Sequence, residues 1–184
     1  MGQSGDNSKT LWITTKTLSY IQAFFSKLFR DLLLINLKFF IVFIGEYKHT
    51  IDPKNRMTIP SKFQGQLTDG AIITRGLDNC LFVFTNEEWK RVAEQIKQQS
   101  FTTANARAFS RLMLAGAMDV KLDTQGRILI PSYLSDYASL GQKVVVAGLY
   151  DRLEIWNENA WETYKKQTEA NANEISEQMS NLGI

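Results

Sequence analysis

Two short segments of this sequence carry the residues whose types and spacing could do chemistry. Each follows the pattern Asp-x-x-x-Arg, first at residues 52–56 and again 71 positions later at residues 123–127. A guanidinium group offers a fork of donors that suits a phosphate or the edge of guanine, and Asn and Gln suit the edge of adenine. The candidate binding residues are Lys54, Asn55, Arg56, Gln125, Gly126 and Arg127.

The same residues also have a purely structural interpretation. An Asp at the end of a strand can accept hydrogen bonds from turn amides two or three residues further on. The fourth residue of each turn must tolerate a left-handed backbone, and Asn55 and Gly126 are of types that do so. Each Arg would then lie within reach of a salt bridge to its Asp, so the pair could serve only to hold the turn together.

The recurrence extends beyond the turns. Residues 51–61 (IDPKNRMTIPS) align with residues 122–132 (LDTQGRILIPS), and residues 76–85 align with residues 148–157 at an offset of 72. Each copy is therefore a unit of roughly 50 residues, and repeated units usually share one core. If a pseudo-twofold axis relates the two units, both turns would be presented from one face of the protein.

Alternation and β-branched content predict the same order of elements in both units. The first should contain strands at 43–50, 57–59, 71–75 and 80–85 and helices at 61–67 and 86–99. The second should contain strands at 118–122, 128–130, 143–149 and 152–156 and helices at 132–137 and 158–170. A connecting helix is predicted over 102–114, and Asn86 and Asn157 are expected to cap the helices that they precede.

These elements divide the chain into five parts. They are an N-terminal extension (1–41), a first unit (43–99), a connecting helical segment (100–117), a second unit (118–170) and a C-terminal tail (171–184). The extension is rich in Phe, Leu and Ile, but its charges leave no run of eighteen apolar residues to span a bilayer. An amphipathic helix on a membrane surface is an alternative, because apolar residues recur at helical intervals over 18–32. We prefer the interpretation that the natural product begins at Val42, read from a GUG codon.

Composition limits the possible functions. The chain has 184 residues, 44% of them hydrophobic, which is typical of a globular protein. His49 and Cys80 are the only residues of their types, so we expect no metal, no cofactor, no small-molecule substrate and no enzymatic activity. Of the net charge of +2, residues 1–41 contribute +3, so the remainder carries −1. Nucleic-acid binding would therefore depend on local clusters of charge.

The repeated segments lead to a known family. Residues 43–180 resemble the MraZ family of bacterial transcriptional regulators, in the run 43–49 (FIGEYKH), in both Asp-x-x-x-Arg turns and in the strand 153–156 (LEIW) before a Trp-containing helix. The resemblance implies an α+β fold. Two tandem SpoVT-AbrB-like swapped-hairpin units would form one pseudo-twofold, double-psi-like β-barrel with flanking helices. Asn55 stands where the family turn usually has Gly, which affects only local contacts.

The resemblance also implies a function. It is that of a sequence-specific regulator that binds short direct repeats of double-stranded DNA in the promoter of its own division and cell-wall operon and represses that operon. Arg56 and Arg127 would be the main DNA contacts, and Asp52 and Asp123 would orient them. The subunits would form a homo-oligomeric ring, cytoplasmic and nucleoid-associated, whose repeated turns bind together. The alternative is a ring-forming assembly protein whose twin turns bind protein partners.

Overall fold

The computed structural model describes residues 20, 22, 24–27, 42–99 and 102–180. The chain divides into Met1–Ile41 and Val42–Ile184, which are described separately. In the first part, residues 20, 22 and 24–27 are helical, and the rest of the predicted amphipathic stretch 18–32 lies outside the described residues. None of the helices that the structure describes is both long enough and apolar enough to cross a membrane.

The predicted order of elements is confirmed in both repeats. The first contains strands β1 (Phe43–Thr50), β2 (Arg56–Thr58), β3 (Ala71–Arg75) and β4 (Leu81–Thr85) and helices α2 (Ser61–Gln64) and α3 (Asn86–Lys97). The second contains strands β5 (Met118–Val120), β6 (Arg127–Leu129), β7 (Lys143–Tyr150) and β8 (Leu153–Asn157) and helices α5 (Ser132–Tyr137) and α6 (Glu158–Ala170). Helix α4 (Ala104–Leu114) connects the repeats, and α7 (Ala172–Ser180) follows them.

The strands of the two repeats are interleaved. One six-stranded antiparallel sheet has the order β1-β7-β8-β4-β3-β5, and β2 pairs with β6 in a separate two-stranded sheet. If each strand is exchanged for its equivalent in the other repeat, the six-strand order stays the same but is read from the opposite edge of the sheet. A pseudo-twofold axis therefore passes between β4 and β8 and between β2 and β6, and the α+β class predicted from the sequence is confirmed.

The expected double-psi-like barrel is not supported, because the strand pairing of the described residues closes no barrel. Strands β1 and β5 are the two edges of the six-stranded sheet and do not pair with each other. The short sheet β2–β6 could have bridged them, but each of its strands has only three residues. Pro60 and Pro131 follow soon after these strands, and proline has no amide hydrogen with which to extend a ladder.

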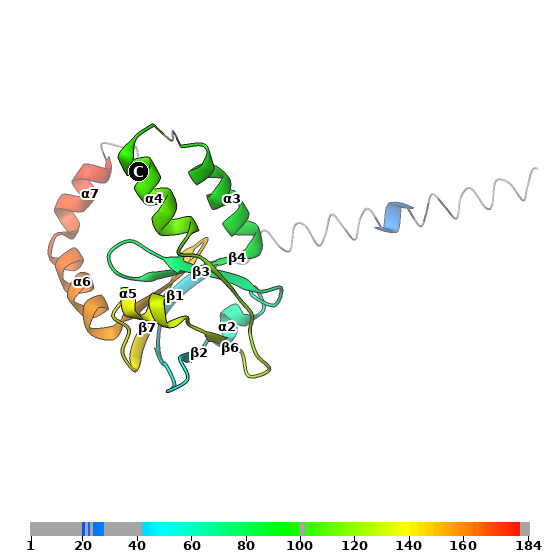
Figure 1. Ribbon diagram of the computed structural model, residues 1–184, viewed down its shortest axis with the longest axis horizontal. Helices are drawn as coiled ribbons and strands as arrows, with labels where there is room; N and C mark the ends of the chain where they lie inside the picture. The colour runs from blue at the N-terminus through cyan, green and yellow to red at the C-terminus, as the bar shows by residue number, and fades with distance from the viewer. Residues whose placement is uncertain (1–19, 21, 23, 28–41, 100–101, 181–184) are drawn as a thin grey trace, which may run out of the picture. The chain divides into compact units, whose positions relative to one another are not determined.

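Two buried clusters hold the fold together. The larger one joins both repeats and contains the inward-facing residues of β2 and β6, Met57 and Ile128. The smaller one lies around Cys80 and Trp156, where burial raises the pKa of the Cys80 thiol. In Figure 1, helices α3 and α4 lie at the upper end of the body, and β2 and β6 lie at the lower end.

The helix caps were predicted correctly in one repeat only. In the second, the Asn157 side chain accepts hydrogen bonds from two amides of α6, as expected. In the first, the cap is Thr85, whose hydroxyl accepts from the Glu88 amide, and Asn86 instead donates its side-chain amide to the Asp69 carbonyl. Thr85 is the residue that aligns with Asn157, so the repeat itself carried the correct signal.

Candidate nucleic-acid interface

The first Asp-x-x-x-Arg turn is held together by its own side chains. Oδ1 of Asp52 accepts hydrogen bonds from the amides of Lys54 (2.8 Å) and Arg56 (3.0 Å). Oδ2 of the same carboxylate lies 2.8 Å from Nε and 2.7 Å from Nη2 of Arg56. The two amides are two and four residues beyond the Asp, so the sequence prediction of two or three is correct for one of them, and the predicted salt bridge is present.

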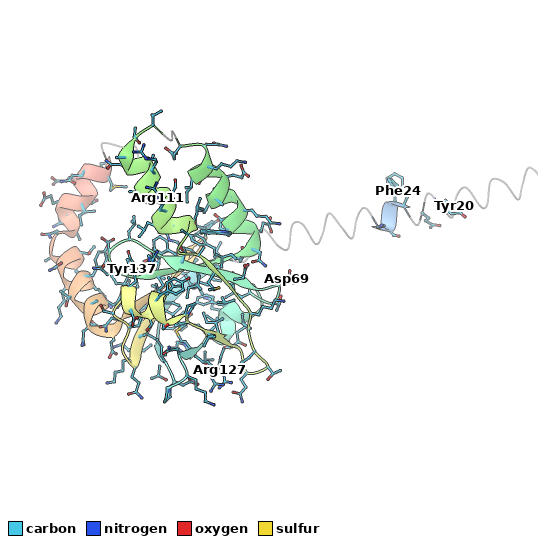
Figure 2. The ribbon with its side chains drawn as sticks, in the orientation of Figure 1. Tyr20, Phe24, Asp69, Arg111, Arg127 and Tyr137 are labelled. Carbon is cyan, nitrogen blue, oxygen red and sulfur yellow. The ribbon has the colours of Figure 1, made fainter. Side chains whose placement is uncertain are left out.

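The second turn has the same geometry. Oδ1 of Asp123 accepts from the amides of Gln125 (2.9 Å) and Arg127 (3.0 Å), and Oδ2 lies 2.8 Å from Nε and 2.7 Å from Nη2 of Arg127. Arg127 is labelled in Figure 2 and lies at the end of the body formed by β2 and β6. Each Asp thus fixes the direction in which its guanidinium group leaves the turn.

A reciprocal pair of backbone hydrogen bonds joins the two turns. The Ile59 amide donates to the Gly126 carbonyl (2.9 Å), and the Ile130 amide donates to the Asn55 carbonyl (2.8 Å). Asn55 has φ 57° and Gly126 has φ 71°, which confirms the left-handed conformation predicted for both. Because each turn supplies an acceptor to the other repeat, neither turn can rearrange alone.

The two-stranded sheet has one buried and one outer face. Met57 and Ile128 point into the core, and alternation along a strand places their neighbours on the opposite side. The outer face is formed by Arg56, Thr58, Arg127 and Leu129.

The register of this sheet places the arginines diagonally. Arg56 is opposite Leu129, and Thr58 is opposite Arg127. Diagonal neighbours in an antiparallel pair are about 7 Å apart, so the two guanidinium groups belong to one small surface. The structure thereby brings together both predicted arginines, with Lys54 and Gln125 exposed at the tips of the turns.

The electrostatics of the turns are dominated by the ion pairs. The hydrogen bond from the Arg56 side chain, followed by that from its amide, lowers the pKa of Asp52 from 3.8 to about 2. Arg127 lowers the pKa of Asp123 to about 2 in the same way. Both carboxyl groups are therefore ionised at neutral pH, and each pair has almost no net charge.

Two further lysines lie beside the turns and were not predicted. Lys121 follows β5 two residues before Asp123, and this spacing was visible in the sequence. Lys143 is opposite Thr50 at the end of β1, next to the hydrogen bond from the Ile51 amide to the Gln142 carbonyl. Only strand pairing between the repeats brings Lys143 to the first turn, so no local signal could have found it.

The described residues contain no group of three or more His, Cys, Asp or Glu side chains placed to hold a metal ion.

Comparison with known proteins matches both repeats to one family. The family model described as "MraZ protein, putative antitoxin-like" matches residues 42–112 and 113–182, and each range contains one Asp-x-x-x-Arg turn. The chain is 45% identical over 141 residues to the Transcriptional regulator MraZ of Caldanaerobacter subterraneus, a match that covers 77% of this chain and 99% of the relative. The proteins of the same name from Natranaerobius thermophilus (45% identity) and Clostridium acetobutylicum (46%) match over 143 residues, 78% of this chain and 100% of each relative.

The pKa of Asp123 can serve as an internal control for the pKa of Asp52. Since the pKa of each is lower in the folded chain than the ordinary 3.8, its contribution to stability is fully present above about pH 4 and is lost as the pH falls toward 2. In the variant Arg56→Gln, the pKa of Asp52 should rise toward 3.8 while that of Asp123 stays near 2. Carboxyl-carbon NMR measures both values, and equal values in the variant would show that the arginine is not the cause.

The difference between Asn55 and Gly126 gives a second test. A Cβ at Gly126 would collide with the side-chain amide of Gln64, which donates to the Ile59 carbonyl at 2.8 Å. The residue equivalent to Gln64 in the second repeat is the smaller Ser135. In Gly126→Asn the Gln64 amide should swing away and lose this hydrogen bond, which should reduce the free energy of unfolding by roughly 0.5–1.5 kcal/mol. In a Gln64→Ser background, which lacks the bond, Gly126→Asn should cost less than half as much in urea denaturation, whereas purely additive effects would contradict this explanation.

Proposed function

The chain belongs to the MraZ family, and from this membership we propose that it is a sequence-specific, DNA-binding transcriptional regulator. The relatives compared above are named as transcriptional regulators, and the family is one of regulators and not of enzymes. The observation that carries the proposal is the pair of Asp-oriented arginines on the outer face of the β2–β6 sheet.

The geometry of this face suits the major groove of DNA. A two-stranded β-ribbon fits into that groove, and an arginine there can donate to O6 and N7 of guanine. Asp52 and Asp123 engage Nε and Nη2 of their arginines. For each arginine, the described residues place no acceptor at Nη1. One N–H of Nη1 and the second N–H of Nη2 therefore form the fork that can donate to the two acceptors of guanine.

The residues around the arginines suit the DNA backbone. Lys54, Lys121 and Lys143 are exposed around the two turns, and lysines placed in this way contact phosphates and fix the position of the protein on the duplex. We propose that the finer expectations also hold: binding to short direct repeats in the promoter of the protein's own division and cell-wall operon, repression of that operon, and a cytoplasmic, nucleoid-associated location.

An apolar surface supports assembly into a homo-oligomer, which we propose to be a ring. Leu77 and Leu149 line a groove of about 490 Å³ and are exposed. Ile44, which is opposite Leu149 in the sheet, is also exposed. Exposed patches of this kind commonly mark contacts with other proteins. Ile44 lies near the opposite end of β1 from the first turn, about 20 Å away along the strand. A second copy could therefore cover this surface and leave the turns free.

Replacing both arginines by lysine tests the assigned DNA site. Lysine keeps the charge but loses the fork, so the variant Arg56→Lys/Arg127→Lys should bind DNA with little preference for sequence. Each bidentate contact is worth about 1–3 kcal/mol of discrimination. Fluorescence anisotropy at one fixed salt concentration would compare the fragment upstream of the protein's own gene with a scrambled fragment.

The matched control is Arg111→Lys, because Arg111 is exposed on α4 (Figure 2), far from β2 and β6. Light scattering should give the same particle mass for all three proteins. Full sequence preference in the double variant would refute the assigned site.

Footprinting of the wild-type chain should protect evenly spaced short repeats, and an absence of protection would favour the alternative in which the turns bind a protein partner.

The assembly surface has its own test. Leu77→Ser/Leu149→Ser should lower the particle mass measured by light scattering, because it removes apolar area from the rim of the groove. Leu114→Ser is the control, since Leu114 on α4 has the same 38% exposure as Leu149. An unchanged mass in the double variant would exclude this surface as the contact between subunits.

A further inference from the structure

One apolar side chain interrupts the polar outer face of the β2–β6 sheet. Leu129 is 57% exposed, whereas Ile128, which precedes it in the strand, and Met57, which is opposite Ile128, are buried. Isolated exposed leucines are common on protein surfaces. This one lies directly opposite Arg56, whose guanidinium group is held by Asp52, so a molecule as large as a DNA duplex that contacted the arginine would also lie close to the leucine.

The pseudo-twofold axis repeats this arrangement with a different residue. Thr58 is opposite Arg127, and Thr58 and Leu129 occupy equivalent positions in the two repeats. Residues directly opposite in an antiparallel pair have their Cβ atoms about 5 Å apart. Each arginine therefore has one methyl-bearing neighbour from the other strand, and this neighbour is large and apolar beside Arg56 but small and hydroxylated beside Arg127.

Such pairs match two adjacent features of the major groove. Guanine presents two acceptors there for an arginine, and thymine presents its C5-methyl group for apolar contact. Successive bases of one strand are about 3.4 Å apart along the axis, so a side chain next to the arginine can reach the neighbouring base.

We propose that Leu129 is a specificity-determining residue, which packs against the C5-methyl of a thymine next to the base contacted by Arg56. This inference rests on the proposed DNA-binding function. Thr58 offers the equivalent base beside Arg127 a single methyl and a hydroxyl that can accept or donate a hydrogen bond. The two turns of one subunit thus read unlike sequences, and the binding site of a subunit is not palindromic although its scaffold is pseudo-symmetric.

Removing the methyl groups from the DNA tests this directly. The full-length chain would be titrated by fluorescence anisotropy against the fragment upstream of its own gene, made either with thymine or with uracil throughout. Burying one methyl group changes affinity by about fourfold. The wild type should therefore bind the uracil fragment at least about fourfold more weakly, and Leu129→Ala should bind both fragments with nearly equal affinity.

Two further variants keep the result interpretable. Leu129→Met retains an apolar side chain and should keep most of the preference for thymine, and Leu114→Ala, on α4, should respond to uracil as the wild type does. Effects of uracil on the shape of the duplex are shared by all the proteins, so they cancel in the comparison. Melting temperatures should be the same throughout, because Leu129 contributes little to the core.

The outcomes separate this inference from the function on which it rests. Equal binding of thymine and uracil DNA by the wild type would overturn the role of Leu129 and leave DNA binding intact. The same preference for thymine in Leu129→Ala as in the wild type would place the methyl contact elsewhere and would also overturn it. If the wild type bound neither fragment, the proposed function itself would fail, and this inference with it.

Discussion

The reciprocal hydrogen bonds between the two turns are the constraint on which the rest of the structure depends. Asn55 and Gly126 must both be left-handed, and their carbonyl groups are the acceptors for Ile130 and Ile59 of the other repeat. Neither repeat can therefore complete its turn without the other. The same contacts align β2 with β6, and this alignment buries Met57 beside the other inward-facing residues and leaves the arginines outside.

The two repeats share the residues that determine the backbone of the turns, and they differ at exposed positions of the outer face. Both turns keep Asp and Arg, because the carboxylate satisfies the turn amides and also fixes the guanidinium group. The fourth residue differs between the repeats, and so do its surroundings: a side chain at Gly126 would have to displace the side-chain amide of Gln64. On the outer face Leu129 is 57% exposed, so packing within the described part of the subunit puts little restriction on the side chain there.

Local patterns predicted the elements and the turns, but pairing between distant strands could not be predicted from them. Alternation located β1, and the combination of Asp with Asn or Gly located the turns, since these signals lie within a few residues of one another. The pairing of β1 with β7 depends on contacts about a hundred positions apart and leaves no periodic trace. For the same reason Lys143 was missed. The barrel was an expectation from the family resemblance, and the pairing of the described strands forms two sheets that close no barrel.

The ion pairs with Asp52 and Asp123 fix the orientation of the two arginines but cancel most of the charge with which they could attract DNA. Each guanidinium group is paired with a carboxylate whose pKa is about 2, so each pair adds little to the long-range attraction of DNA. Attraction by phosphate contacts scales with the number of cations that displace counterions, and the lysines that the described residues place at the turns are Lys54, Lys121 and Lys143. In the proposed homo-oligomer, a near-neutral subunit of this kind would gain affinity for DNA mainly by repetition, because linked copies raise the effective concentration of each turn. Under the proposed function, the geometry of the Asp–Arg pairs would determine which bases are accepted, and the number of copies would determine how tightly the DNA is held.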